Sequence, residues 1–211
     1  MSKVTALRTG KGRGKRVNIF LDGKFAFSLE AEVAAKEGLR VEQVLSANQI
    51  EALARSDHFQ RCFNAAVHYL SYRPRSEAEI RRRLHQRGFD GDNVEAVIIR
   101  LKEQGLVDDM AFAQFWNENR ESFSPRSRRL TSLELRQKGI AKDIIDRVVD
   151  VIDDEANAYR AALSKARSLP DADYQSFRRR LGEYLKRRGF SYEVINRTVK
   201  QIWQEQVSNA K

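Results

Sequence analysis

The sequence is poor in the residues that build metal sites, disulfides and sharp backbone breaks. Of its 211 residues one is cysteine, Cys62, three are histidine and three are proline. A single cysteine excludes a disulfide framework and a thiolate zinc cluster. The N-terminus has no apolar leader, and no stretch reaches the roughly 20 apolar residues that a membrane-spanning helix needs. We therefore expect a cytoplasmic protein without a membrane partner.

Enzyme motifs are missing as well. No GxSxG, HExxH or paired-carboxylate pattern occurs, and the acidic run from Asp150 to Glu155 is interpreted as the end of a helix. His58 and Cys62 stand four apart, but no second pair exists to complete a metal site, so we expect a core cysteine and a surface histidine. The stretch GKGRGK from Gly10 to Lys15 fails as a phosphate loop because a strand pattern follows it. We predict no enzyme, no metal and no cofactor.

What the chain has in excess is positive charge. Thirty-nine Lys and Arg against 29 Asp and Glu give a net charge of +10 and a pI near 9.9. This balance favours nucleic acid or an acidic protein surface as the partner, and less often an anionic membrane. The few prolines and the many Ala, Leu, Arg, Glu and Gln residues favour helix over sheet.

The first thirty residues predict a small antiparallel β-element. Asp22-Gly23 separates the apolar runs Val17–Leu21 and Lys24–Ser28, which is a strong hairpin signal because both turn positions require a positive φ. Residues 3–8 could add a third strand. Two helical segments are then expected, Glu30–Glu37 ending at Gly38, and Ser46–Ser56 opening with a Ser46–Gln49 capping box.

From Asp57 onward the chain is periodic. Gly88, Gly139 and Gly189 are spaced 51 and 50 residues apart, and apolar residues fall into register 4 positions before and 6, 10 and 13 positions after each glycine. The last three offsets lie on one face of an α-helix. The aligned residues are Leu84, Leu135 and Leu185; Val94, Ile145 and Ile195; Ile98, Val149 and Val199; Leu101, Ile152 and Ile202.

Each repeat therefore predicts three helices. The first helices are expected at Asp57–Tyr72, Asp108–Phe123 and about 155–168, with Asp57 and Asp108 as N-caps. A basic second helix ends at each glycine, and a third carries the apolar face. The predicted fold is mainly α, with tandem three-helix repeats in an elongated curved array and a small N-terminal β-hairpin element. The expected domains are residues 1–56, 57–107, 108–154 and 155–211.

The second helices are the most distinctive feature. Ser76 with Glu79 predicts a capping box, Ser127 keeps the cap, and the glycines suit a left-handed C′ residue. The third repeat has the connection Leu169-Pro170-Asp171 in place of Pro-Arg-Ser. These features explain the ends of the helices and leave the arginines between them unexplained.

Windows around the three second helices carry net charges of +4, +5 and +5, which together exceed the charge of the whole chain. Like charges three and four apart repel on a helix, so this recurrence suggests a basic strip that binds a polyanion or an acidic groove. The candidate binding residues are Arg73, Arg75, Arg81, Arg82, Arg83, Arg87, Arg126, Arg128, Arg129, Arg136, Lys138, Arg178, Arg179, Arg180, Lys186, Arg187 and Arg188. The aromatic residues Phe112, Phe115, Trp116 and Trp203 are expected to pack in the core or to cap it, not to stack on bases.

The segments YLSYRPRSEAEIRRRL and LKEQGLVDDMAFAQFWNENR, with the hairpin VNIFLDGKFAFSL, resemble the RecX family of recombination regulators over essentially the whole chain. The resemblance implies a non-enzymatic protein that binds in the groove of RecA–DNA filaments and inhibits strand exchange, ATP hydrolysis and filament growth or stability. It also implies direct binding of single- and double-stranded DNA, which we expect to be weaker and non-specific, and we expect a monomer.

Two alternatives compete with this interpretation. One is a general DNA-binding protein that uses its basic helices as helix-turn-helix readers or as non-specific contacts. The other is a helical-repeat scaffold for an acidic partner without nucleic acid. Base readers place Asn, Gln or Arg at the N-terminus of one helix. The basic residues here run through whole helices, which favours non-specific contact.

Overall fold

A computed structural model describes residues 1–10, 16–169 and 173–209. Within these ranges the chain forms mostly helices, preceded by a small antiparallel sheet, which confirms the predicted mainly α class with tandem three-helix repeats. No helix in the described part of the chain is both long enough and apolar enough to cross a membrane. The predicted loop over residues 10–15 and the connection 169–171 fall almost wholly outside the described residues.

The N-terminal sheet has four strands in the order β3-β2-β1-β4, all paired antiparallel. Strand β1 spans Ser2–Thr9, β2 Arg16–Leu21, β3 Lys24–Glu30 and β4 Val44–Leu45. Both turn residues between β2 and β3 have positive φ, +50° at Asp22 and +83° at Gly23, which confirms the predicted hairpin. Strand β4 was not predicted, because two residues are too few to show a period.

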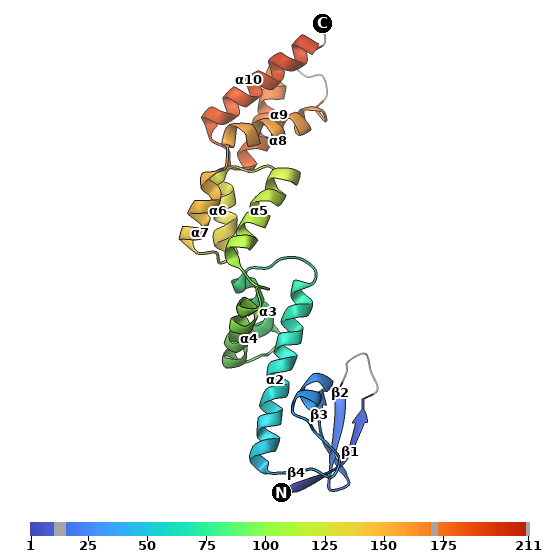
Figure 1. Ribbon diagram of the computed structural model, residues 1–211. Coiled ribbons are helices and arrows are strands. Elements are labelled where there is room, and N and C mark those ends of the chain that lie inside the picture. The colour runs from blue at the N-terminus through green and yellow to red at the C-terminus, as the bar shows by residue number, and fades with distance from the viewer. Residues whose placement is uncertain (11–15, 170–172, 210–211) are drawn as a thin grey trace. The chain divides into compact units, whose positions relative to one another are not determined.

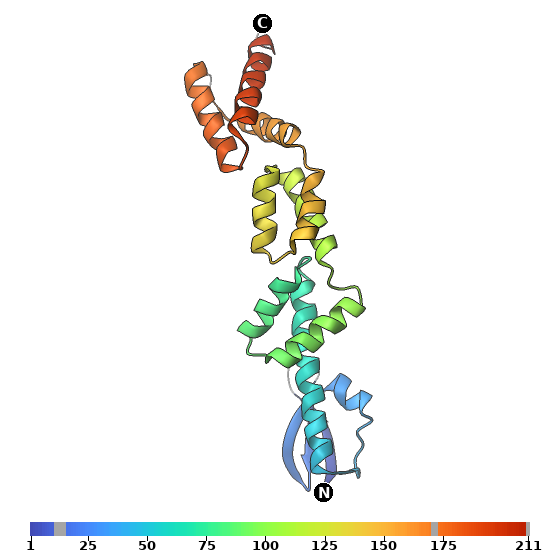
Figure 2. The ribbon, with the colours of Figure 1, turned by 90° about the vertical axis from the view of Figure 1, so that its left-hand side faces the viewer.

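Helices α1 (Ala31–Lys36) and α2 (Ala47–Leu70) cover the sheet, and Figure 1 and Figure 2 show them beside it. The Ser46–Gln49 capping box at the start of α2 is confirmed. The predicted break at residue 56 is wrong: the two expected helices form one continuous helix of 24 residues. No glycine or proline interrupts Ala47–Leu70, so nothing in the backbone ends the helix at that point.

Asp57 is consequently not an N-cap. Its side chain is 9% exposed and turns toward the sheet, where one carboxylate oxygen accepts a hydrogen bond from the backbone N–H of Glu30 at 2.6 Å. The other oxygen lies 3.3 Å from one guanidinium nitrogen of Arg16, and a second nitrogen of Arg16 pairs with the carboxylate of Glu30. Asp57 thus joins the middle of α2 to the end of the sheet and the start of α1.

The remaining helices form three three-helix units. The first unit consists of the C-terminal half of α2, α3 (Glu77–Gln86) and α4 (Gly91–Glu103); the second of α5 (Asp109–Phe123), α6 (Arg128–Gln137) and α7 (Lys142–Asp150); the third of α8 (Asp154–Ala166), α9 (Tyr174–Arg187) and α10 (Tyr192–Asn209). All twelve apolar residues that the glycine alignment placed in register are at most 9% exposed. The helical repeat is therefore confirmed, and the exact domain boundaries stay predictions.

By its contacts the chain divides into two compact units. One comprises Met1–Arg73 and Ile80–Leu106, and the other comprises Pro74–Glu79 and Val107–Lys211. The first turn of α3 therefore belongs with the second and third repeats. In the first compact unit, Cys62 belongs to the core of the first repeat and is fully buried, as predicted. His58 is partly exposed and lies 3.0 Å from the carboxylate of Asp90.

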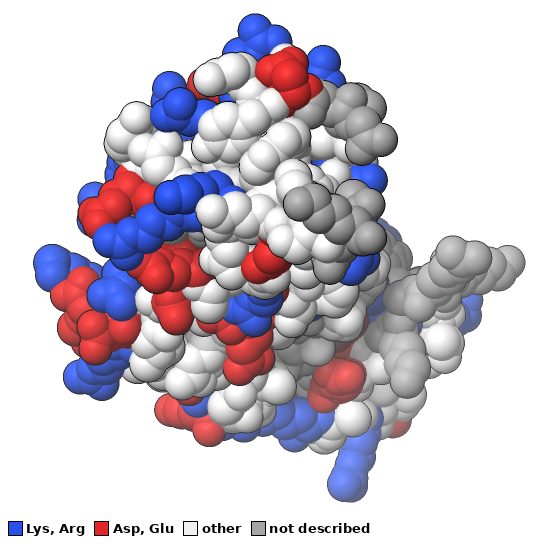
Figure 3. Space-filling view, turned by 90° about the horizontal axis from the view of Figure 1, so that it is seen from above, with Lys and Arg blue, Asp and Glu red and all other residues white. Residues whose placement is uncertain are grey.

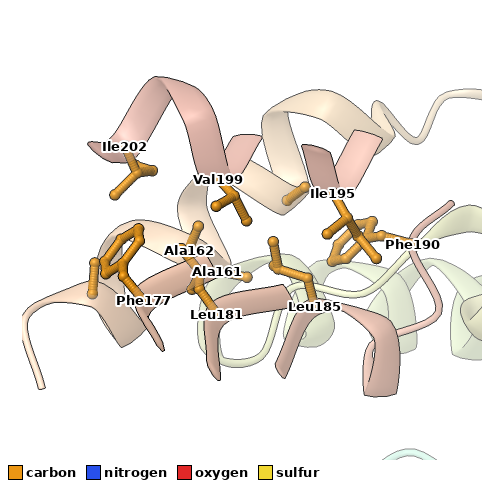
Figure 4. Close-up of a cluster of buried hydrophobic side chains, with 11 residues drawn as sticks. Ala161, Ala162, Phe177, Leu181, Leu185, Phe190, Ile195, Val199 and Ile202 are labelled. Carbon is orange, nitrogen blue, oxygen red and sulfur yellow. The ribbon is translucent and has the colours of Figure 1, made fainter. Parts of the chain in front are cut away.

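The third repeat illustrates how each repeat builds its core. Figure 4 shows Phe177, Leu181 and Leu185 on one face of α9, turned toward Ile195, Val199 and Ile202 of α10. Two alanines of α8, Ala161 and Ala162, lie between them and allow the three helices to approach closely. Trp203 packs against Tyr174 and Phe177 at the edge of this core, and Trp116 packs against Phe112 in the second repeat, as the sequence predicted for the two tryptophans.

Candidate basic binding surface

The second helices α3, α6 and α9 begin at defined caps. The hydroxyl of Ser76 accepts a hydrogen bond from the N–H of Glu79 at 3.2 Å, and that of Ser127 from the N–H of Leu130 at 3.1 Å. The carboxylate of Asp173 takes this place in α9 and accepts from Gln175 and Ser176. These contacts confirm the predicted serine caps and show what replaces Pro-Arg-Ser in the third repeat.

The C-terminal end of α6 contacts the start of α3, and the C-terminal end of α9 contacts the start of α6. The hydroxyl of Ser76 donates to the carbonyl of Lys138 at 2.6 Å, and the N–H of Ser127 donates to the carbonyl of Arg188 at 3.0 Å. At this contact Gly139 has a φ of +80°, and a Cβ on it would lie 2.4 Å from the Cβ of Ala78. A Cβ on Gly189 would lie 2.6 Å from the Ser127 hydroxyl. Both glycines are therefore required by conformation and by close approach.

Acidic residues at the start of the first helices complete this contact. Asp108 and Asp153 cap their own helices, α5 and α8. The following residue in each case caps the preceding second helix: Asp109 accepts from the N–H of Glu77 at 2.8 Å, and Asp154 accepts from the N–H of Arg128 at 2.7 Å. The acidic run at residues 150–155 thus has a structural role. The repeated Asp-Asp pair was the sequence signal that could have revealed it.

Glu134, on α6, holds part of the predicted basic surface in place. Its buried carboxylate accepts hydrogen bonds from the Trp116 indole and from Arg120, both at 2.8 Å, and pairs with Arg126. Burial lowers the pKa of Arg126, and the charges of Arg120 and Arg188 lower it further. The negative charge of Glu134 offsets this repulsion, so Arg126 is a structural residue.

Four other predicted binding residues also have partners within the protein. The Lys138 ammonium lies 2.7 Å from the buried carboxylate of Glu79. The Arg128 guanidinium donates to the carbonyls of Asp150 and Ile152 at 2.9 and 3.0 Å. Two further contacts are Arg188 over the ring of Tyr184, 4.0 Å from its centroid, and Arg81 paired with Glu95. The expectation that the arginines lack a structural explanation is wrong for Arg81, Arg128 and Arg188, because each contacts a group elsewhere in the protein. For Arg81 and Arg128 that group is 14 to 24 positions away in sequence, while the Tyr184 ring lies on the same helix as Arg188.

The rest of the predicted set divides by exposure. Arg73 and Arg75 are partly buried, and the Arg83 guanidinium lies 5.7 Å from the centroid of the Tyr69 ring. Nine side chains are exposed and form no hydrogen bond, ion pair or ring contact with any other residue that the structure describes. These are Arg82, Arg87, Arg129, Arg136, Arg178, Arg179, Arg180, Lys186 and Arg187. Figure 3 shows Lys and Arg side chains next to Asp and Glu side chains on the face turned to the viewer.

Four of these exposed cations meet at a groove in the second compact unit. The groove has a volume of about 650 Å³ and lies along α9 and the first turn of α10. Arg178, Arg179 and Lys186 line it from α9, and Arg129 lines it from α6. Glu183 is the acidic residue among its lining side chains. The geometry provides a concave surface with excess positive charge, which is suited to binding an anion.

Comparison with known proteins agrees with this architecture. Four regions of the chain match descriptions of RecX domains: the N-terminal domain of regulatory protein RecX over residues 2–46, and the first, second and third three-helix domains of RecX over residues 62–101, 108–149 and 153–199.

Related proteins and structures extend over almost the same length. Regulatory protein RecX from Clostridium botulinum strain Eklund 17B is 30% identical over 95% of this chain and 96% of its own, and that from Clostridium perfringens strain 13 is 27% identical over 96% and 97%. A crystal structure of regulatory protein RecX has a TM-score of 0.69 at 27% identity, with 94% of this chain and 98% of that chain covered. The structure of RecX from Lactobacillus salivarius, at 23% identity and a TM-score of 0.58, supports the fold alone. The chain belongs to the RecX family.

Proposed function

We propose that this protein is a non-enzymatic regulator of RecA recombinase. It binds in the groove of RecA–DNA filaments through the exposed cations of α3, α6 and α9. Binding inhibits strand exchange and ATP hydrolysis and limits filament growth or stability. The observation that carries the proposal is that each of the three second helices has exposed basic side chains without a partner among the described residues, in a chain that belongs to a regulatory family.

The physical argument concerns charge at repeated positions. Each exposed Arg or Lys supplies a contact to a DNA phosphate or to an acidic side chain of the filament, and each contact alone is weak because it is solvated and screened by salt. Contacts from three tandem repeats in one chain act together, so the whole binds more tightly than any part. Phosphate contacts also release counterions, so affinity should fall steeply with salt concentration. In this proposal the protein acts as a monomer in the cytoplasm, and its direct DNA contacts are non-specific.

A general DNA-binding protein is the second candidate, because the same cations would contact duplex phosphates. The contacts at the N-termini of α3 and α6 argue against a sequence-specific helix-turn-helix reader. Such readers present the N-terminal residues of the recognition helix to base edges. Here the N–H of Glu77 is bonded to Asp109, and the N–H of Ser127 is bonded to the carbonyl of Arg188. These N-termini are occupied by the following repeat.

The decisive experiment measures RecA ATPase activity and strand exchange on single-stranded DNA with substoichiometric amounts of this protein. Inhibition of both is expected. Tight sequence-specific binding to duplex DNA without inhibition would overturn the proposal in favour of a DNA-binding protein. No inhibition of RecA and no binding to DNA would favour the third candidate, a scaffold for an acidic partner.

A charge-reversal pair tests the surface itself. Arg82→Glu with Arg87→Glu changes two exposed residues of the first repeat's second-helix region and leaves the Arg81–Glu95 pair intact. We expect this variant to inhibit at least about tenfold less well. The matched control, Lys36→Glu with Arg61→Glu, makes the same charge change at exposed positions of α1 and α2. Equal loss in both variants, with native circular dichroism, would show that only net charge matters.

A further inference from the structure

The groove along α9 has a composition that a general basic surface does not require. Arg129, Arg178, Arg179 and Lys186 surround it, and all four are exposed and without a hydrogen bond or ion pair to another described residue. Among the described lining residues, Glu183 is the one acidic side chain that can offset the repulsion among these four cations. An anion of several charges would relieve this repulsion when it enters.

Gly182 keeps the groove open on the side of α9. Glycine in the middle of a helix is unfavourable relative to alanine, and here packing does not require it, because an added Cβ would meet the Ile195 side chain at an ordinary 3.7 Å. The φ of Gly182 is also not in the left-handed region, in contrast to Gly189 at the end of the same helix. The absence of a side chain therefore has its evident effect in the groove, which it deepens between the cations and the first turn of α10.

Aromatic and apolar groups form the rest of the lining. Phe190 and Ile195 line the groove, and both belong to the core of the third repeat. Tyr192 also lines it and is 74% exposed. A carboxylate-rich peptide would use the cations and leave the exposed Tyr192 ring without a partner. An unpaired nucleotide would use both, since its base can stack on an exposed ring while its phosphates contact arginine and lysine.

We propose that this groove is a binding site for single-stranded nucleic acid, in which Arg129, Arg178, Arg179 and Lys186 hold consecutive phosphates and Tyr192 stacks on an unpaired base. The inference rests on the proposed function and deepens it, because it assigns the contact with the unpaired strand to the third repeat and the adjoining part of α6.

The test uses the full chain and a fluorescein-labelled 20-nucleotide oligo(dT), with binding followed by anisotropy over a range of NaCl concentrations. Arg178→Ala with Arg179→Ala removes two groove cations. Arg180→Ala with Arg187→Ala is the matched control, since these residues lie on the same helix, are equally charged and exposed, and do not line the groove. We expect at least about tenfold weaker binding and a salt slope smaller by about 1.4 for the groove pair, and a several-fold smaller effect for the control. Equal losses would overturn the groove as a site.

A second pair of variants tests stacking. Tyr192→Ala should weaken oligo(dT) binding by about tenfold, whereas Tyr192→Phe, which keeps the ring, should bind like the natural chain. An abasic oligonucleotide of the same length should bind the natural chain and Tyr192→Ala equally. If poly-glutamate of matched charge displaces oligo(dT) as well as unlabelled oligo(dT) does, the groove binds acidic chains in general and the proposal is overturned.

The proposed function and the groove assignment can be refuted independently of each other. A chain that binds oligo(dT) through the groove but does not inhibit RecA ATPase would refute the proposed function and leave the groove assignment standing. A chain that still inhibits RecA and still binds oligo(dT) normally after loss of the groove cations would refute the groove assignment alone.

Discussion

The hydroxyl of Ser76 donates a hydrogen bond of 2.6 Å to the carbonyl oxygen of Lys138, 62 positions further along the chain. The same hydroxyl accepts from the N–H of Glu79 and so caps its own helix. One side chain thus begins a second helix and receives the end of the next one. Asp173, which caps α9, offers only acceptor oxygens and could not donate to such a carbonyl. In the second repeat the donor to the corresponding carbonyl, that of Arg188, is the backbone N–H of Ser127, so the hydroxyl-to-carbonyl bond is specific to Ser76.

The close approach at this contact predicts a difference between two glycines. Gly139→Ala forces a Cβ to 2.4 Å from that of Ala78 at a φ of +80°, so we expect a loss of about 2–4 kcal/mol in the free energy of unfolding. Gly88→Ala has nearly the same φ, +84°, and nothing within 4 Å, so we expect only about 1–2 kcal/mol. Urea denaturation followed by circular dichroism measures both. Equal losses would mean that the interface yields at Ala78.

Removal of the charge of Glu134 should be among the most costly changes in the second repeat. Glu134→Gln leaves Arg120 and Arg126 partly buried without their carboxylate, and we expect a loss of about 3 kcal/mol. Glu183→Gln is the control, an exposed position on α9 where a change within about 0.5 kcal/mol is expected.

The same variant has a spectroscopic readout. The Trp116 indole donates to Glu134, so its emission in a Trp203→Phe background should shift when the carboxylate becomes an amide. A Glu134→Gln protein with unchanged stability and unchanged emission would contradict the structural role assigned to this group.

Gly182→Ala should act in the opposite direction to Gly139→Ala. The added methyl group meets only ordinary contact with Ile195 at 3.7 Å, and alanine is the better helix former, so we expect a gain of about 0.5–1 kcal/mol. Thermal unfolding followed by circular dichroism would detect it. A destabilised variant would show that the helix needs glycine at this position for packing.

Cys62 should behave as a buried and unreactive thiol. Burial raises its pKa from 9.0 to about 11, with a smaller contribution from the charge of Asp90. The thiolate fraction at pH 8 is therefore small, and we expect reaction with a chromogenic disulfide reagent to be slow in the native protein and fast in urea. Rapid reaction of the native protein would indicate that the first repeat opens readily.

The pH dependence of stability follows from the same shift. A thiol that ionises less readily in the folded than in the unfolded chain contributes stability below pH 9, and that contribution is lost as the pH rises from 9 to about 11. Lysines and tyrosines also titrate in this range, so the informative quantity is the difference between the natural chain and Cys62→Ala. This difference should shrink across the interval, and a constant difference would contradict the shift.

Local patterns predicted most of the fold. The Asp22-Gly23 turn and the Ser46 and Ser127 caps depend on neighbours a few residues away, and the twelve aligned apolar positions follow from spacings of 51 and 50 residues in the repeat. Each of these predictions is confirmed. Asp57 was misjudged because an aspartate before a helical run looks like a cap, and its true partners, Glu30 and Arg16, lie 27 and 41 positions away.

The candidate site was predicted less completely, because the partners of its charged side chains also lie far away in sequence. Spacing located the basic helices but could not separate Lys138, which pairs with Glu79 at a distance of 59 positions, from Arg136 two positions earlier, which is exposed. The groove was also beyond reach, because it depends on how Arg129 of α6 is placed beside α9. Contacts between repeats determine which cations remain available for binding.

The uninterrupted course of α2 has a mechanical consequence. A helix of 24 residues is about 36 Å long at a rise of 1.5 Å per residue. Its N-terminal half is attached to the sheet through Asp57, and its C-terminal half packs against α4. A force or a torque on the first repeat is therefore transmitted to the sheet along one continuous helix. We expect the sheet and the first repeat to move together as one rigid body.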